Sequence, residues 1–554
     1  MKSILSKISI GICGMAAVLS ASCVGDLDLA PNDPHYINGG SLTVQDYQGV
    51  LNKCYGGMAY SGQGGPNGNC DISGLDGGTS QYTRALFMMN EFPTDEAIWI
   101  HPDVGIIDLV TNTWGKDNAN IFGTYSRLYS HIAVCNDFIR MARDNSDPAV
   151  RLMVLEARAL RAMSYYWVID IFGRGSYTLD TDPMFASPEQ KDRRFLYEWL
   201  DGELTDIETL FEEEFPANQV QYGRIGIDGV MALHARLSLN AGVYTDGAVN
   251  GYKQCSSLCE RIIERHLGGG FDGSGLAVNY MYLFCADNDE YMPGGANKAE
   301  NEILWGIPYD SQYTQAYGGT QFLIAAATAN ETNGFQMSSA DYGINNPWKC
   351  MHASKQFSEK FAPEDIRWSM WGKENAGFSI SNDKMGDFDK GYAVIKFTNL
   401  LKGVDGKWSE ANGGTYAPAG TPPRAETWVD TDQPLIRLAD VYLMYAECNI
   451  MAGAGDTSKA LTYVNYVRRR AGVTPWTAME MTSDNILSER CRELYWELTR
   501  RSDLIRFGKF SENYNWMWKG NVRDGQNFGS YMNVMPIPTN IIAAQPTFVQ
   551  NPGY

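Results

Sequence analysis

The sequence is poor in the residues and motifs that mark common enzymes and metal proteins. Its 554 residues include six histidines, and no combination of cysteines and histidines has the spacing of a zinc site. It contains no Gly-x-Ser-x-Gly elbow, Walker loop, dinucleotide-binding fingerprint or His-Glu-x-x-His motif. These absences argue against the enzyme classes that carry such motifs.

Basic residues are few relative to acidic ones. The chain has 45 Lys and Arg against 65 Asp and Glu, which gives a formal charge of −20. A protein that binds nucleic acid or another polyanion needs clustered Lys and Arg. We therefore expect no nucleic-acid partner, whereas uncharged ligands are compatible with this composition.

Long apolar runs are missing beyond the first 22 residues. The most apolar helical pattern covers residues 148–173, where Asp147 can cap the helix, Pro148 suits its first position and Gly173 can end it. Two arginines and an aspartate leave at most about eight unbroken apolar or aromatic positions, where a membrane span needs about 20. We expect a core helix between two layers.

Residues 1–22 have the pattern of a secretory signal peptide: two lysines, an apolar run and small residues before a cleavage point. Cys23 directly follows the small residues, which is typical of a bacterial lipoprotein. A lipid on Cys23 would anchor the protein, and plain secretion is the alternative. Residues 23–45 lack periodicity and are predicted to form an extended tether.

The remaining cysteines do not suggest a disulfide framework. Nine of the 11 are left once Cys13 leaves with the signal peptide and Cys23 is lipidated, which is an odd number. Most lie in helical patterns and are predicted to be small buried apolar residues. A disulfide between Cys54 and Cys70 is left open.

Periodic apolar residues predict a mainly α protein. Helices are expected at 43–60, 117–143, 149–172, 189–214, 224–243 and 250–266, and again at 435–447, 457–471 and 483–501. Their lengths and short connections, with small residues where helices would touch, resemble tetratricopeptide hairpins with a loose period.

The middle of the chain differs from the helical parts in composition and in periodicity. Residues 267–432 are rich in Gly, Asn and aromatic residues, with strand-like runs only at 302–308 and 391–397. Because helical patterns flank this region on both sides, we predict a single domain over residues 46–554. In this domain a helical scaffold, about 46–266 and 433–520, carries an irregular, loop-rich inserted lobe at about 267–432.

Aromatic residues are abundant, with 14 Trp, 31 Tyr and 22 Phe making up 12% of the chain. Residues 90–103 combine Trp99, His101 and Asp103 in a segment with little regular pattern. Sugar recognition needs such a combination, because C–H faces pack on a ring while hydroxyls bind polar groups. The alternative for Trp99 is a loop aromatic that caps the core.

Further candidate rings lie in the lobe. Tyr317 precedes two glycines and Phe335 follows Asn333-Gly334, so both rings are expected at turns and exposed. Additional loop candidates are Trp348, Trp371, Trp408 and Trp428.

Two kinds of charged segment are candidate sites. The acidic run Asp287-Asn288-Asp289-Glu290 fits a solvated surface loop best, and a calcium site that uses Asp287 and Asp289 is the next interpretation. The arginine runs 468–470 and 500–501 are interpreted as structural cations at the C-terminal ends of helices. No cofactor other than calcium is expected.

Several motifs together resemble the SusD/RagB-like outer-membrane lipoproteins over nearly the full length. They are Cys23 followed by acidic residues, Arg158–Ala162 before Tyr-Tyr-Trp, Gly223-Arg224 before Ala235–Gly242, Arg437–Leu443, Glu489–Glu493, Arg501–Gly508, Pro536–Pro538 and Gln550–Tyr554. The resemblance implies a non-catalytic, lipid-anchored protein of the outer membrane, displayed at the cell surface beside a TonB-dependent transporter.

Four loops look like those of the family's starch-binding founder: residues 90–96, 286–290, 317–319 and 332–334. By this resemblance Trp99 and Tyr317 match aromatic residues of the founder's glycan site. His101 and Phe335 replace two of its rings, and Arg84 matches a polar contact. Together with Asp103 and Asn333, these residues form the expected glycan-binding set.

The resulting prediction is capture of a neutral oligosaccharide or polysaccharide, best an α-glucan, and its delivery to a SusC-like transporter. A surface glycoside hydrolase is the alternative from another class, and it would need two carboxylates facing an aromatic cleft. A SusD-like binder of host N-glycans or of peptides is the third reading.

Overall fold

The computed structural model describes residues 42–183, 186–216, 220–289, 299–329, 338–371, 391–401, 409–411, 415–417 and 423–554. The predicted signal peptide, Cys23 and nearly all of the predicted tether lie outside these residues. Residues Gln48–Tyr554 group into one compact unit.

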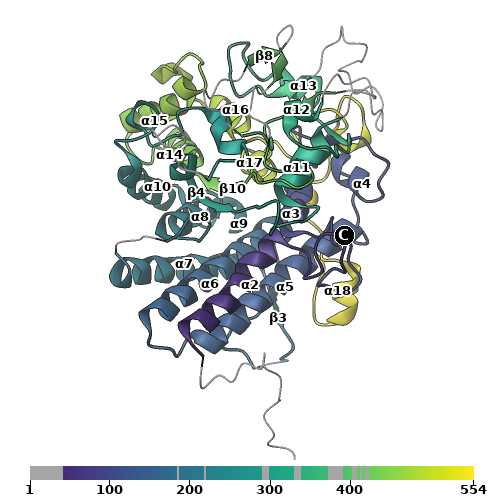
Figure 1. Ribbon diagram of the computed structural model, residues 1–554, viewed down its shortest axis with the longest axis vertical. Coiled ribbons are helices and arrows are strands. Elements are labelled where there is room, and N and C mark those ends of the chain that lie inside the picture. The colour runs from purple at the N-terminus through teal and green to yellow at the C-terminus, as the bar shows by residue number, and fades with distance from the viewer. Residues whose placement is uncertain are drawn as a thin grey trace, which may run out of the picture. The chain divides into compact units, whose positions relative to one another are not determined.

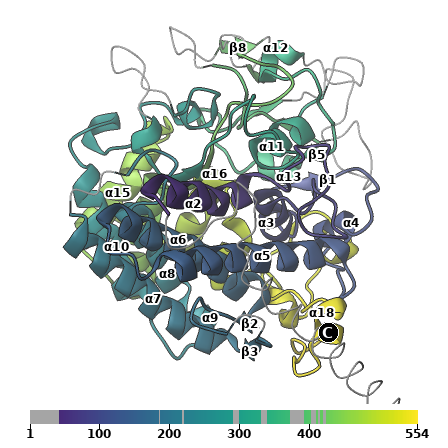
Figure 2. The same ribbon diagram turned by 60° about the horizontal axis from the view of Figure 1, so that its bottom comes forward.

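A continuous series of packed helices forms the scaffold (Figures 1 and 2). In chain order it runs through α5 (Ala119–Ala142), α6 (Pro148–Trp167), α7 (Arg193–Glu214), α8 (Ile227–Leu239) and α10 (Tyr252–His266), each packed against the next. α10 also packs against α14 (Leu438–Ala452), which contacts α15 (Thr457–Arg470) and α16 (Ser483–Leu494). The prediction of a mainly α, tetratricopeptide-like helical scaffold is confirmed.

The remaining helices are short or peripheral. They are α2 (Val44–Ala59), α3 (Tyr82–Asn90), α4 (Ile106–Val110), α9 (Ala241–Tyr244), α11 (Gly319–Ala327), α12 (Ser339–Tyr342), α13 (Lys355–Ser358), α17 (Arg500–Arg506) and α18 (Thr539–Ala544). Among the described residues, no helix is both long and apolar enough to cross a membrane.

Strands in the described part of the chain pair only in twos, and each pair is antiparallel. The pairs are β1 (Ile98–Trp99) with β5 (Met351–His352), β2 (Gly175–Tyr177) with β3 (Glu189–Lys191), β4 (Ile303–Ile307) with β10 (Gln433–Arg437), β6 (Met370–Trp371) with β7 (Ala393–Val394), and β8 (Ser409–Ala411) with β9 (Thr415–Ala417). Both predicted strand-like runs therefore contain strands, β4 and β7.

Helix α6 begins and ends as its sequence predicts. The Asp147 side chain accepts a hydrogen bond from the Ala149 N–H (2.8 Å), and Pro148 occupies the first turn. A π-helical turn, Val168–Phe172, follows and ends at Gly173, whose φ of 70° favours glycine. The charges within the helix are paired, because buried Arg161 binds Asp180 and Glu203 at 2.8 Å each.

One helix boundary differs because of a tertiary contact. The helix predicted at 483–501 ends at Leu494, and Trp496 and Leu498 have φ of 64° and 67°. The Trp496 backbone N–H and its ring N–H both donate to Glu96, to its carboxylate (3.1 Å) and its carbonyl (3.0 Å). The bond from the backbone N–H replaces the one that a continuing helix would have made, and the ring bond fixes the Trp496 side chain.

Two further expectations need correction. Residues 435–437 belong to β10 rather than to a helix, because this apolar segment pairs with β4. Arg500 and Arg501 lie in the first turn of α17, not at the C-terminal end of a helix. They bind the buried carboxylates of Asp95 and Asp170, so their role is structural, as predicted.

Cysteines in the described part of the chain all carry free thiols. Cys54 is buried in α2 and Cys70 is only partly buried, and the two do not pair. The expectation of mostly buried cysteines is confirmed for the described residues.

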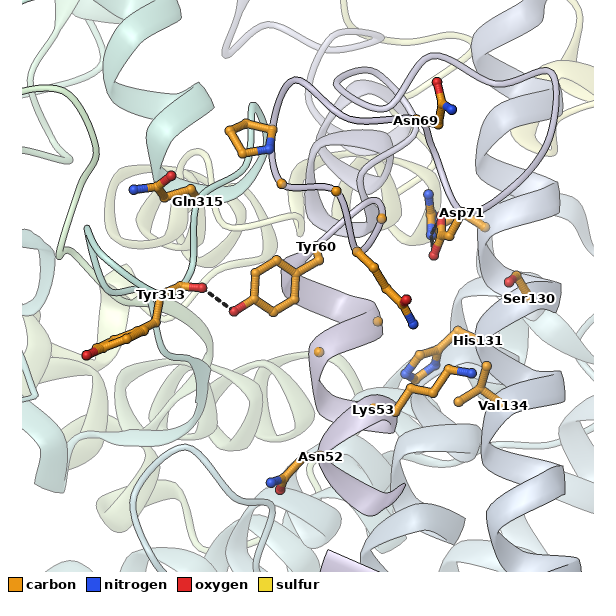
Figure 3. Close-up of a pocket in the computed structure, with 18 of the residues that line it drawn as sticks. Asn52, Lys53, Tyr60, Asn69, Asp71, Ser130, His131, Val134, Tyr313 and Gln315 are labelled. Carbon is orange, nitrogen blue, oxygen red and sulfur yellow. Dashed lines mark hydrogen bonds and ion pairs between the residues drawn. The ribbon is translucent and has the colours of Figure 1, made fainter. Parts of the chain in front are cut away.

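A cavity of about 910 Å³ opens beside α2 (Figure 3). Its walls come from α2, from the glycine-rich segment 62–71, from α5 and from the segment 312–315.

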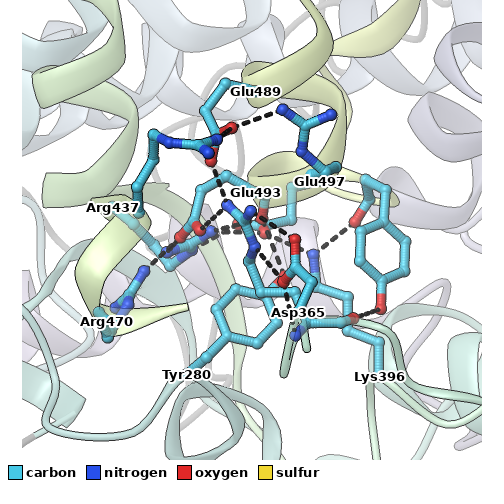
Figure 4. Close-up of polar contacts among 12 residues, drawn as sticks. Tyr280, Asp365, Lys396, Arg437, Arg470, Glu489, Glu493 and Glu497 are labelled. Atoms are coloured by element: carbon cyan, nitrogen blue, oxygen red, sulfur yellow. Dashed lines mark hydrogen bonds and ion pairs between the residues drawn. The ribbon is translucent and has the colours of Figure 1, made fainter. Parts of the chain in front are cut away.

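A buried ion-pair network ties the lobe to the scaffold (Figure 4). Arg437, at the end of β10, binds Glu302 (2.6 Å), Glu497 (2.7 Å) and Glu493 (3.1 Å). Arg367 of the lobe also reaches Glu493 at 3.1 Å. Burial alone would raise the pKa of Glu493, but the surrounding guanidinium charges lower it to about 2.

A second buried charge cluster joins α7 to α8. His234 lies between Glu208, 2.7 Å from its Nδ1, and Asp201, 3.0 Å from its Nε2. Burial lowers the pKa of His234, but the two carboxylates outweigh it and raise the pKa to about 9. The imidazole is therefore a cation that holds two helices together at neutral pH.

Candidate functional site

A run of six aromatic side chains extends from the segment 99–101 into the lobe, beside α3. Neighbouring ring centroids are separated by 6.4 Å (His101–Trp99), 6.2 Å (Trp99–Phe322), 6.4 Å (Phe322–Trp348), 6.1 Å (Trp348–Tyr317) and 5.2 Å (Tyr317–Trp428). We call these six residues the ring cluster. Trp99 and Phe322 are buried, whereas the other four are partly exposed. The cluster therefore offers apolar ring surface to a ligand.

Tyr317 is positioned by the two glycines that follow it. A Cβ on Gly318 would lie 2.2 Å from the Gln81 side-chain oxygen, and a Cβ on Gly319 would lie 2.0 Å from the Tyr309 hydroxyl. The Gly319 N–H, at a φ of 57°, donates to Gln81 (3.2 Å). Only glycine permits this approach, so the predicted turn after Tyr317 is confirmed.

Trp428 is brought to Tyr317 by Gln321 of α11. The Gln321 side-chain oxygen accepts from the Val429 N–H (3.1 Å), and its amide donates to the Thr427 carbonyl (3.3 Å). These two hydrogen bonds fix the backbone on both sides of Trp428, and so they fix the position from which its indole ring projects.

Arg84 lies within the ring cluster. Its guanidinium carbon stands 4.6 Å from the centre of the Phe322 ring and 5.7 Å from that of Trp348, and Nη1 donates to the Tyr317 carbonyl (3.0 Å). Burial lowers the pKa of Arg84 to about 10, so it stays charged at neutral pH. The described contacts make Arg84 a support for three rings, and its contact with a sugar stays a prediction.

The segment with Trp99, His101 and Asp103 forms one end of the cluster. Trp99 lies in β1 and is 3% exposed, so the expected exposed stacking face is not found and the core-capping alternative describes it better. Its ring N–H donates to the exposed Asp103 carboxylate (2.8 Å). His101 is partly exposed beside it. Asp103 thus orients the indole, and the sugar contacts of both polar residues stay predictions.

Two carboxyls with raised pKa values lie next to this segment. Burial raises the pKa of Glu91 strongly and that of Glu96 to about 7, although the Arg500 charge opposes the shift at Glu96. Perturbed carboxyls near rings are a pattern of glycosidase sites. However, both side chains are at most 1% exposed, so they do not face a cleft in which a substrate could lie.

The acidic run in the lobe is not the solvated loop that its sequence favours. Asp287 and Asn288 are buried, and the Cys285 thiol donates to Asp287 (3.1 Å). Within the described residues, no group of three His, Cys, Asp or Glu side chains is arranged to hold a metal ion. Calcium at Asp287 and Asp289 stays a prediction.

Asn333 and Phe335 lie outside the described residues, so their predicted contacts stay predictions. The structure also adds residues that the sequence did not single out: Gln81, Gln321 and Phe322. Each of the three is buried in the fold. Neither the composition nor the spacing of the sequence distinguishes them from other residues of the core.

The chain was compared with known proteins. A model of the SusD family matches residues 301–554. The starch-binding protein SusD of Bacteroides thetaiotaomicron is 31% identical over 98% of this chain and 98% of its own. The chain belongs to the SusD family. A second relative, a SusD-like protein of Bacteroides ovatus, is 23% identical over 72% of this chain and 69% of its own.

Solved structures of the SusD superfamily share the fold. A SusD superfamily protein from Parabacteroides distasonis superposes with a TM-score of 0.66 at 17% identity, covering 93% of this chain and 100% of that one. Surface glycan-binding protein A from Bacteroides thetaiotaomicron, solved in complex with laminarihexaose, superposes with a TM-score of 0.63 at 18% identity, covering 92% and 99%. The likeness in fold thus extends over nearly the whole chain.

Proposed function

We propose that this SusD-family protein binds a neutral oligosaccharide or polysaccharide on the ring cluster without cleaving it. The observation that carries the proposal is the close spacing of three partly exposed rings, Tyr317, Trp348 and Trp428, on a rigid support. Successive sugar units can stack on neighbouring rings, and the acidic net charge does not oppose an uncharged ligand.

An α-glucan is the favoured ligand class. The support is the identity with a relative named for starch binding and the match of the Tyr317-Gly318-Gly319 turn to that resemblance. Moderate affinity suffices, because a protein that passes its ligand on must also release it.

The proposed setting is the outer surface of a Gram-negative outer membrane. A lipid on Cys23 would hold the protein there, and a SusC-like TonB-dependent transporter would receive the glycan. The lipoprotein pattern of residues 1–23 and membership of the SusD family support this placement.

The sugar class is tested with the soluble form that starts at Gly25, by calorimetry and affinity electrophoresis. Starch, pullulan, dextran and two β-linked glucans are compared for the wild type, Tyr317→Ala and Trp348→Ala. We expect binding to at least one α-glucan that both substitutions weaken. Binding to a β-glucan, to N-glycans or to peptides alone would contradict the α-glucan assignment.

Catalysis is tested separately by incubating the protein with the glucan that binds best and measuring reducing-sugar release. We expect none above the buffer control. Turnover that disappears on mutation of a single carboxylate would establish the glycoside hydrolase alternative instead.

The calcium prediction has its own readout. If Asp287 and Asp289 bind Ca²⁺, the melting temperature of EDTA-treated protein rises on addition of calcium chloride and does not rise for Asp289→Asn. An unchanged melting temperature in the wild type would remove calcium from the description.

A further inference from the structure

We infer that the cavity beside α2 (Figure 3) is a second binding site for a hydroxyl-rich, uncharged ligand, and that it receives a further stretch of the saccharide chain held by the ring cluster. This inference rests on the proposed function. At about 910 Å³ the cavity has the size of ligand sites in general.

The lining has the chemistry of a sugar site. Five carboxamides contribute to it: Asn52, Gln63, Asn69, Gln312 and Gln315. Each offers a hydrogen-bond donor and an acceptor without charge, which matches the dual character of sugar hydroxyls. A lining rich in these groups favours a neutral polyol over a charged ligand.

The buried charge in the cavity wall is compensated, and Lys53 of α2 adds one exposed cation to the lining. Arg127 of α5 is 2% exposed, and it donates to the Asp71 carboxylate (2.9 Å) and to the Ser80 carbonyl (2.7 Å). This pairing leaves no free guanidinium to attract an anion.

A single exposed ring stands at the rim. Tyr313 is 77% exposed, yet its backbone is held on both sides, because its N–H donates to Asp310 (2.8 Å) and its carbonyl accepts from the Tyr60 hydroxyl. An exposed tyrosine on a fixed backbone loses little conformational entropy when a sugar stacks on it. Tyr60 lines the same cavity (Figure 3).

His131, the only histidine among the described residues of the lining, is not available for chemistry. His131 is 3% exposed, and its ring nitrogens are bound to the Ser164 hydroxyl (2.8 Å) and the Cys54 carbonyl (2.9 Å). Burial lowers its pKa to about 4, so it is neutral. The cavity is therefore suited to binding rather than to acid–base catalysis.

The cavity borders the ring cluster at two segments. The segment 312–315 lines the cavity, and Tyr317 of the ring cluster lies two residues after it. The Tyr317 hydroxyl donates to Asn67 (3.0 Å), which lies in the glycine-rich segment that forms another cavity wall. A linear ligand that extends beyond Tyr317 would therefore reach the cavity along this shared border.

The inference is tested by calorimetry with short and long oligosaccharides: maltotriose and maltoheptaose, and laminaritriose and laminarihexaose. Three sugar units can occupy the three partly exposed rings, whereas the longer chains must extend past them. Tyr313→Ala removes the rim ring, and Ser130→Phe fills the cavity from α5. Met479→Ala, which removes an 88% exposed side chain outside the cavity lining, is the matched control.

We expect both cavity variants to weaken binding of the longer oligosaccharide at least about five-fold and to leave trisaccharide binding within about two-fold. If both variants leave the longer oligosaccharide unaffected while Trp348→Ala weakens it, the inference is overturned and the proposed function stands. If no glucan binds the wild type, the proposed function fails and the inference fails with it. If the cavity variants weaken binding of the longer oligosaccharide and Trp348→Ala does not, the ring cluster is refuted as the glycan site, and the inference that the cavity extends it is overturned.

Discussion

Replacement of Trp428 by alanine tests the outer end of the ring cluster. The indole lies 5.2 Å from Tyr317 and is partly exposed. We take about 50 Å² of its apolar surface as open to a sugar, with a similar area on the sugar face. Burial of about 100 Å² at about 25 cal/mol per Å² contributes about 2.5 kcal/mol. Since Tyr317 can retain part of the contact, we expect a loss of about 1.5–2.5 kcal/mol, or about 10- to 70-fold in Kd.

The assay is calorimetry with the α-glucan that binds the wild type best. Trp199→Ala is the matched control, because Trp199 is also partly exposed and packs on tyrosines, Tyr165 and Tyr177, but lies in α7 of the scaffold. The backbone around Trp428 should persist in the variant, since Gln321 binds only main-chain groups there. A folded Trp428→Ala protein whose Kd changes less than two-fold would refute the assignment of the ring cluster as the glycan site.

Three further predictions concern the framework. Glu493→Gln removes a buried charge that Arg437 and its neighbours need, so we expect urea unfolding to show a loss of about 3–5 kcal/mol, and a loss below about 1 kcal/mol would contradict the role of the network. The pKa of His234 is about 9 in the folded protein and about 6.5 in the unfolded chain. Its protonated ring therefore stabilises the fold fully below pH 6.5, and this contribution is lost as the pH rises through 9. We therefore expect the unfolding free energies of wild type and His234→Gln to differ by at most about 3 kcal/mol below pH 6.5 and by less as the pH rises to 9. A difference that does not change with pH would argue against the raised pKa of His234. Gly319→Ala places a Cβ at a positive φ, 2.0 Å from the hydroxyl of Tyr309. We therefore expect a lower melting temperature and weaker glycan binding. If neither value changes, the backbone after Tyr317 adapts to the extra methyl group.

Local signals in the sequence predict the ends of α6. Asp147 and Pro148 mark its start and Gly173 marks the end of its π-helical turn, because capping depends on neighbouring residues. The helix predicted through Trp496 is wrong, because hydrogen bonds to Glu96, distant in sequence, end a helix that the local pattern would continue. Strand β10 was missed for a similar reason, since its conformation depends on pairing with β4.

The candidate site also has features that local sequence signals predict and features that they do not. The Tyr317 turn could be predicted, because two adjacent glycines after a tyrosine mark a close approach of the backbone. The burial of Trp99 could not, because the exposure of an aromatic ring in a loop depends on what packs over it. The family resemblance predicts Arg84 as a polar contact to the glycan. Only the structure shows that Arg84 supports the rings around it.

The helical class, the positions of most scaffold helices, the lack of a predicted membrane span within the scaffold and the family resemblance can all be predicted without the structure. They follow from composition, from apolar periodicity over a few helical turns and from short motifs. Which rings share a surface depends on tertiary packing. Trp348, Tyr317 and Trp428 come together because Gln81, Arg84 and Gln321 bind backbone groups far away in the sequence. Such contacts between distant residues depend on how the whole core packs, and no local pattern encodes them.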